Sequence, residues 1–273
     1  MALALPLPPL KLLSSALAAA SSSQESSSSS SLSSFSYRPA VILPGLGNNS
    51  SDYKKLEATL NEQYGVPTLV AKVSRLDWLR NAAGLVDPNY WRGTLRPRPV
   101  LDWYLKRVDE AVLEAKELAQ GGTLSLIGHS AGGWLARVYM EEFGLSDISL
   151  LLTLGTPHLY IQGAPFFGSS IANVESVIPN DNAEVAVVND VDTSASNATT
   201  LRARLVGQGY KQVCGQADIW GDGVVPEVSA HLEGAYNITL DGVYHSPVGS
   251  DDASRPWYGS PVIVEKWIHY LLN

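Results

Sequence analysis

The sequence contains almost no cysteine. Cys214 is the single cysteine among 273 residues, so no intrachain disulfide can form and no cysteine-rich metal site is available. Such a chain suits a reducing compartment, although this does not exclude an oxidising one. Long apolar runs are also missing. None reaches about 18 residues without a charge, and we expect no segment that spans a bilayer.

Positive charge is scarce as well. The chain has 19 Lys and Arg against 27 Asp and Glu, which gives a formal net charge of −8 and a pI near 5.1. An acidic chain presents no general basic field to nucleic acid or to an anionic membrane surface, so we expect no nucleic-acid partner. Apolar residues are plentiful: 45% of the chain is hydrophobic, which is enough for one large α/β domain.

The N-terminal segment differs from the rest of the chain. Its first 36 residues hold fourteen serines and only two charged side chains, Lys11 and Glu25, a composition that cannot form a packed core. The segment resembles plant chloroplast transit peptides. The run LLSSALAAA leaves a secretory signal as the alternative, although no Lys or Arg precedes it. We expect residues 1–37 to be a targeting peptide, followed by one domain over 38–273.

In that domain, apolar runs of strand length alternate with segments of helical period. This order is typical of a mostly parallel sheet covered by helices on both faces. Strands are predicted over 40–43, 67–73, 123–128, 147–155, 210–215 and 235–240. Helices are predicted over 53–65, 101–120, 132–144 and 260–272.

One motif lies where a predicted strand turns into a predicted helix. Residues 128–132 read Gly-His-Ser-Ala-Gly, which matches G-x-S-x-G in the context that makes this pattern informative. Glycines allow the strand and helix to approach closely, and the turn lifts the Ser130 hydroxyl above the strand end. We therefore expect Ser130 to be a nucleophile and the Ala131 N–H to face an oxyanion. A tight glycine-rich turn with an idle serine is the alternative.

The loop LPGLGNNS, residues 43–50, follows the first predicted strand. Gly45 and Gly47 allow its backbone to turn inward, so that the Leu46 N–H becomes the second oxyanion donor. An ordinary Pro-Gly turn is the alternative. The stretch lacks the lysine and the spacing of a nucleotide-binding loop.

Five stretches together carry a resemblance to a known family. They are VILPGLG, IGHSAGG, LGTPH, GDGVVP and YHSP, in that order along the chain. From about residue 38 to the C-terminus the chain resembles the α/β-hydrolase superfamily, in particular its lipase-like branch. The resemblance implies an α/β-hydrolase fold with cap-like insertions, and triad residues in the order Ser, Asp, His.

The triad needs a base and an acid downstream of Ser130. The resemblance places the base at His245, just after the last predicted strand, and leaves His231 as the alternative. It places the acid at Asp222 in GDGVVP, with Asp218 as the main alternative and Asp241 as a residue that could cap a strand. The remaining histidines fit less well: they are His129, which is expected to project elsewhere, His158 and His269.

Two long connections bear on the substrate. Residues 75–99 and about 159–200 are too long for simple links and carry aromatic side chains. We expect them to form a cap whose aromatic residues bind substrate, namely Trp78, Trp91, Phe166 and Phe167, although these could instead pack the insertions onto the sheet.

The expected activity is hydrolysis of carboxylic esters, and most readily of lipid acyl esters such as acylglycerols or galactolipids, with peripheral contact to membrane lipid. No metal or organic cofactor is required by this chemistry. A thioesterase or an acyltransferase would use the same triad, and a non-catalytic protein of the same fold that binds a small ligand is the competing class.

Overall fold

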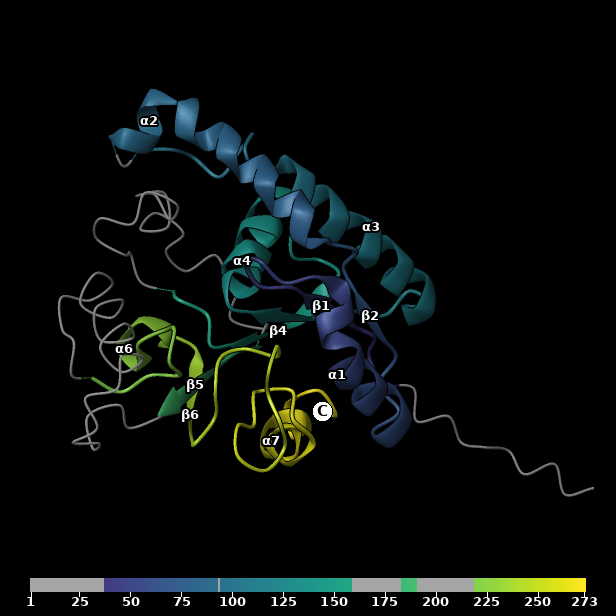
Figure 1. Cartoon of the computed structure of the whole chain (residues 1–273). Coiled ribbons are helices and arrows are strands. Elements are labelled where there is room, and N and C mark those ends of the chain that lie inside the picture. The colour runs from purple at the N-terminus through teal and green to yellow at the C-terminus, as the bar shows by residue number, and fades with distance from the viewer. Residues whose placement is uncertain (1–36, 93, 159–182, 191–218) are drawn as a thin grey trace, which may run out of the picture. The chain divides into compact units, whose positions relative to one another are not determined.

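The apolar runs of the sequence form one parallel sheet. The computed structural model describes residues 37–92, 94–158, 183–190 and 219–273, and for 183–190 it describes the backbone. The sheet has the strand order β2-β1-β3-β4-β5-β6, and every neighbouring pair is parallel (Figure 1). Its strands are β1 (Ala40–Leu43), β2 (Thr68–Val70), β3 (Leu124–His129), β4 (Ile148–Leu154), β5 (Ala183–Asp190) and β6 (Tyr236–Asp241).

Helical segments connect these strands. Between β1 and β2 lie η1 (Ser50–Tyr53), α1 (Lys54–Ala58) and η2 (Thr59–Gln63), and between β2 and β3 lie η3 (Arg75–Val86), α2 (Pro88–Trp91) and α3 (Asp102–Ala119). Further along the chain follow α4 (Ala131–Phe143), α6 (Glu227–Ala230), α7 (Pro261–Trp267) and η5 (Ile268–Tyr270).

Helices cover both faces of the sheet, as the sequence predicts. Successive side chains of a strand point to opposite faces, so β1 sends Val41 and Leu43 to one cluster and Ala40 and Ile42 to another. The first cluster includes the buried residues of α3 and α4, and the second includes those of α1 and α7. Figure 1 shows these two helix pairs on opposite sides of the strands. This layered parallel sheet is the architecture of an α/β-hydrolase fold.

The structure corrects one expectation about the insertions. The segment over about 159–200 is not all cap, because Ala183–Asp190 forms β5, which pairs with β4 and β6 inside the sheet. The sequence AEVAVVND carries the signal, since it is an apolar run of strand length. The other connection, 75–99, contains the helices η3 and α2.

Several expectations concern residues outside the described part of the chain. They are the targeting peptide over 1–37, apart from its last residue, the strand over 210–215, Cys214, Asp218, Phe166 and Phe167. These expectations therefore stay predictions.

Candidate active site

Ser130 lies at the sharp turn between β3 and α4. Its backbone angles, φ 55° and ψ −129°, are in a region that side-chain-bearing residues rarely adopt. The turn is held by two hydrogen bonds: the Ser130 N–H donates to the Leu154 carbonyl at 2.9 Å, and the Gly133 N–H donates to the Ser130 carbonyl at 3.1 Å. The strained geometry is thus built into the connection between strand and helix, where the G-x-S-x-G pattern predicts it.

The glycines around Ser130 are required by close packing. A Cβ on Gly128 would lie 2.2 Å from Gly133 Cα, and a Cβ on Gly132 would lie 2.2 Å from the Leu43 carbonyl oxygen. Neither contact is possible for a larger residue. Because Ala131 begins α4, its backbone N–H has no intrahelical acceptor and stays available next to Ser130.

The loop after β1 packs directly against this turn. A Cβ on Gly45 would lie 2.8 Å from Ser130 Cβ, so the Gly45 backbone touches the serine. The loop is braced, because the Gly45 N–H donates to the Tyr53 hydroxyl at 2.8 Å and the Asn48 N–H donates to the Gly45 carbonyl at 3.1 Å. Leu46 follows Gly45 in this loop, so it lies beyond the carboxyl end of β1, as Ser130 lies beyond that of the parallel strand β3.

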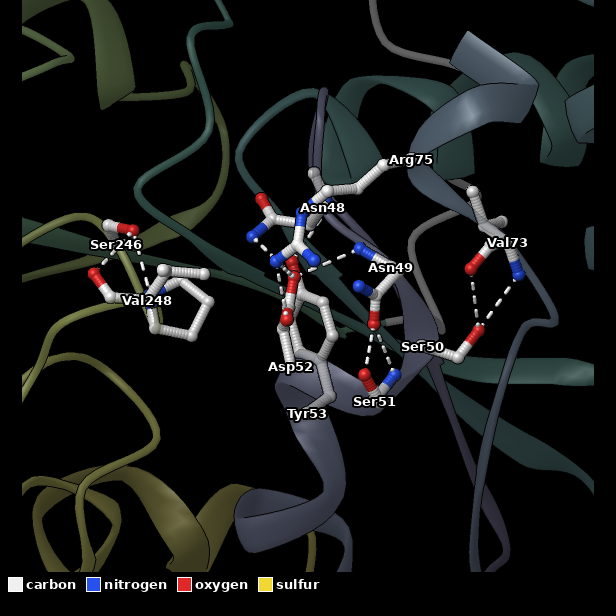
Figure 2. Close-up of polar contacts among 12 residues, drawn as sticks. Asn48, Asn49, Ser50, Ser51, Asp52, Tyr53, Val73, Arg75, Ser246 and Val248 are labelled. Carbon is white, nitrogen blue, oxygen red and sulfur yellow. Dashed lines mark hydrogen bonds and ion pairs between the residues drawn. The ribbon is translucent and has the colours of Figure 1, made fainter.

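A carboxylate on η1 anchors the far end of the same loop. Asp52 accepts two hydrogen bonds from Arg75 Nη2, at 2.8 and 2.9 Å, one from the Asn49 N–H at 3.0 Å and one from Asn48 Nδ2 at 3.3 Å. Figure 2 shows these side chains converging on Asp52. The Trp78 indole N–H also donates to the Asn48 carbonyl at 2.8 Å. The loop therefore has a fixed shape.

His245 and Asp222 form a buried pair. The Nδ1–H of His245 donates to Asp222 Oδ2 at 2.5 Å, and the two side chains are 9% and 1% exposed. The backbone also joins them, because the His245 N–H donates to the Asp222 carbonyl at 3.1 Å. A carboxylate on Nδ1 orients the imidazole and leaves its Nε2 as the basic atom.

The Asp222 carboxylate is fully hydrogen-bonded. Its Oδ1 accepts from the N–H groups of Val224 and Val225 at 2.9 and 2.7 Å, and its Oδ2 accepts from the Tyr258 hydroxyl at 2.9 Å as well as from His245. Burial alone would raise the pKa of Asp222, but the neighbouring His245 and the backbone N–H groups outweigh it and hold the pKa below its ordinary value. Asp222 is therefore an anion at neutral pH.

Gly155 of the LGTPH stretch packs against this carboxylate. It has φ +57°, and a Cβ there would lie 2.6 Å from both Asp222 Oδ2 and the Tyr258 hydroxyl. His158 of the same stretch is buried elsewhere: its N–H donates to the Ser229 carbonyl at 2.6 Å, and its Nε2 lies 3.1 Å from Thr153 Oγ1. His158 therefore holds the segment that follows β4 in place through these hydrogen bonds.

His129 connects the two halves of the site, a role that the sequence does not indicate. Its Nδ1 lies 2.7 Å from the Tyr53 hydroxyl, and its Nε2 lies 2.9 Å from the His245 carbonyl oxygen. A carbonyl oxygen only accepts, so Nε2 carries the hydrogen and donates to His245. Nδ1 of the neutral ring then accepts from the Tyr53 hydroxyl, which itself accepts from the Gly45 N–H. Burial lowers the pKa of His129 to about 3, with a further contribution from His245, so the ring is neutral.

The other candidate residues lie apart from this site or in its supports. The His231 side chain is 46% exposed and faces Glu227, Asp241 is exposed at the end of β6, and His269 belongs to η5. Trp78 is buried against Trp103 and Tyr104, whereas Trp91 is 73% exposed. The role of Trp78 and Trp91 in substrate binding, and that of Phe166 and Phe167, stays a prediction.

Among the described residues, no group of three or more His, Cys, Asp or Glu gathers as metal ligands. No helix in the described part of the chain is long and apolar enough to cross a membrane.

Solved structures share this fold. The chain is similar to the lipase BlEst2 of Bacillus licheniformis in its mature form, with 15% identity, a TM-score of 0.54, and coverage of 87% of this chain and 93% of that one. It is similar to the lin2722 gene product of Listeria innocua, with 14% identity, a TM-score of 0.51, and coverage of 87% and 94%. It is also similar to the phospholipase PlaB of Legionella pneumophila, with 13% identity, a TM-score of 0.54, and coverage of 86% of this chain and 60% of that one. No protein-family model and no curated protein matches the sequence.

Proposed function

We propose that this chain is a serine hydrolase that cleaves carboxylic esters. Ser130 is the nucleophile, His245 the general base and Asp222 the residue that orients the base. The observation that carries the proposal is the combination of a strained serine at the strand-to-helix turn with a buried His245–Asp222 pair. The two parts are joined, because the carbonyl oxygen of His245 accepts a hydrogen bond from His129, the residue before Ser130.

In the proposed reaction, Ser130 Oγ attacks the acyl carbonyl carbon while His245 Nε2 takes the hydroxyl proton. The N–H groups of Ala131 and Leu46 donate to the oxyanion of the tetrahedral intermediate. The intermediate collapses to an acyl-enzyme when the carbon–oxygen bond of the ester breaks, and His245 gives its proton to the departing alcohol. Water then repeats the sequence with His245 as base and releases the acid.

We place the substrate among lipid acyl esters. Two of the similar structures are a lipase and a phospholipase by name, and the predicted aromatic cap suits an acyl chain. Thioesters would pass through the same intermediate, so the test compares p-nitrophenyl esters and acyl thioesters of short and long chain. Long-chain oxygen esters are expected to be the best substrates.

The test of the catalytic assignment is covalent labelling of the full chain with a fluorophosphonate. The wild-type protein should be labelled, and Ser130→Ala should not. His245→Ala should abolish turnover, whereas His231→Ala should retain it, because that residue faces solvent. Equal labelling of the Ser130→Ala variant, or the reverse result with the two histidines, would contradict the assignment.

We also propose that residues 1–37 direct the chain to the chloroplast. The support is the serine-rich composition with two charged residues among the first 36. A fluorescent reporter fused behind residues 1–45 should enter chloroplasts in plant cells. Entry into the secretory pathway would instead favour the alternative.

A further inference from the structure

The segment over residues 75–98, called the arm below, has a charge opposite to that of the whole protein. It contains five arginines and two aspartates, a net charge of +3, whereas the chain carries −8. Its first part is η3, a 3-10 helix of twelve residues, and α2 follows. In Figure 1 these two helices run from the sheet alongside α3, and α2 lies at the end remote from the strands.

One side of the arm packs onto the domain. A 3-10 helix repeats every three residues, so positions three apart share one line of its surface. Trp78 is buried against Trp103 at a ring distance of 5.2 Å, and Asn81 Oδ1 accepts from the Trp103 indole at 2.9 Å. Gly84, the next position on the line, leaves room for Leu95, which a Cβ would approach to 3.1 Å. Because residues 78, 81 and 84 face the domain, the other two lines of η3 face solvent.

The outward side carries large apolar side chains in solvent. Leu76 and Leu79, again three residues apart, are 75% and 69% exposed, and Val86 is 85% exposed. Trp91 is 73% exposed, and its indole N–H donates to the Leu85 carbonyl at 3.0 Å, which holds the ring beside the end of η3. Soluble surfaces rarely gather such residues on one segment unless another apolar phase covers them.

Cationic side chains follow these residues along the arm. Arg92 and Arg96 are exposed, and neither forms an ion pair with any carboxylate in the described part of the chain. The other three arginines are paired: Arg75 with Asp52, Arg80 with Asp77 of the arm, and Arg98 with Asp102 and Glu142. Two unpaired guanidinium groups therefore belong to the same segment as the exposed leucines, valine and tryptophan. This combination is typical of helices that lie in the headgroup region of an anionic bilayer.

We propose that the arm is a docking surface for an anionic lipid bilayer. Leu76, Leu79, Val86 and Trp91 enter the interface, and Arg92 and Arg96 contact lipid phosphates. The negative charge of the remaining chain orients the protein, because only the arm is attracted to the surface. The arm starts at Arg75, whose guanidinium pairs with Asp52 of η1, and the loop before η1 touches Ser130. This proposal does not depend on catalysis.

The test is sedimentation of the full-length Ser130→Ala protein with vesicles of phosphatidylcholine, with and without phosphatidylglycerol. The inactive protein should bind the mixed vesicles, and about 0.5 M salt should release much of it. The triple variant Leu76→Gln, Leu79→Gln and Val86→Gln should reduce the partition coefficient by about tenfold or more. Arg92→Gln with Arg96→Gln should reduce it by about fivefold per arginine on the mixed vesicles.

A matched control uses exposed apolar residues elsewhere. Leu113, Leu118 and Val262 are 54%, 48% and 50% exposed, and their change to Gln should leave binding unaltered. Equal binding by the arm variant and the parent, or an equal loss in the control, would overturn the proposal. The proposal would also be overturned if the parent protein were a dimer and the arm variant a monomer. In that case a second copy of the chain would cover the apolar residues of the arm. Since the parent lacks Ser130, an outcome here leaves the esterase proposal untouched.

Discussion

The Nε2–H of His129 donates to the carbonyl oxygen of His245 across 2.9 Å, although 116 residues separate them in sequence. The opposite ring nitrogen accepts from Tyr53, whose hydroxyl in turn binds the Gly45 N–H. One buried imidazole therefore ties the loop that carries the proposed base to the loop that carries the proposed oxyanion donor.

Replacing His129 should impair the reaction without disturbing substrate binding. In His129→Leu, the carbonyl of His245 and the hydroxyl of Tyr53 lose their partner, which costs about 1–3 kcal/mol of stability for each buried group. We expect kcat to fall at least about tenfold with KM little changed, because only the geometry at the reacting atoms shifts. Steady-state kinetics on one p-nitrophenyl ester measures this.

The control for His129 is Tyr53→Phe, which leaves the bond to His245 in place. It should lose stability in the same range but keep more activity. If His129→Leu lowered stability and left kcat unchanged, the residue would have a structural role only.

The backbone strain at Ser130 should be visible in stability. Glycine adopts φ 55° and ψ −129° without penalty, whereas alanine retains the clash of its Cβ. We expect Ser130→Gly to be more stable than Ser130→Ala by about 1 kcal/mol, while both are inactive. Urea denaturation followed by circular dichroism compares them. A more stable alanine variant would show that the turn is relaxed.

The contact between Gly45 and Ser130 predicts a sensitive position in the loop. An alanine Cβ at residue 45 would lie 2.8 Å from Ser130 Cβ and 3.0 Å from the His129 carbonyl oxygen. We expect Gly45→Ala to lower kcat/KM by about a hundredfold, as loss of an oxyanion donor does. Gly47→Asn is the control, because its Cβ meets nothing within 4 Å and asparagine tolerates positive φ. Similar losses in both variants would contradict the contact as the cause.

The Tyr258 hydroxyl should stabilise the Asp222 anion. Because the pKa of Asp222 is held below its unfolded value, this stabilisation is present at neutral pH and is lost as the pH falls through the folded-state pKa. Tyr258→Phe should cost about 1.5–3 kcal/mol at neutral pH and less in acid. Unfolding in urea at several pH values measures both. A cost that does not change with pH would assign Tyr258 to packing alone.

Buried neutral histidines predict acid sensitivity of the fold. Burial lowers the pKa of His158 to about 3, as it does for His129, while an unfolded histidine titrates near 6.5. The unfolded state therefore binds more protons between these values, and stability is lost as the pH falls from about 6.5. His158→Gln should make the slope of unfolding free energy against pH shallower by about 1.4 kcal/mol per unit in this window. An unchanged slope would mean that His158 is protonated in the fold.

Much of the fold follows from local pattern. The predicted runs at 40–43, 123–128, 147–155 and 235–240 become β1, β3, β4 and β6, because each is an apolar run of strand length. The predicted strand over 67–73 narrows to Thr68–Val70, since the Ser50 hydroxyl binds the Ala71 carbonyl and the Val73 N–H. β5 is missed because it lies inside a stretch interpreted as one insertion.

Within the site, the sequence alone determined Ser130 as the candidate nucleophile. The glycines that the strand-to-helix turn requires lie within two residues of Ser130, so the pattern can be recognised without the tertiary structure. The family resemblance named His245 and Asp222 as the expected partners of Ser130, with His231 and Asp218 as alternatives. The tertiary structure decided that His245 meets Asp222, that Tyr53 and His129 support both loops, and that Tyr258 binds the carboxylate, since these contacts join residues 23 to 116 positions apart. The net charge of the chain gave no indication of the arm, although its five arginines are present in the sequence. That Leu76 and Leu79 face solvent was decided by the tertiary structure, in which Trp78 and Asn81 pack against the domain.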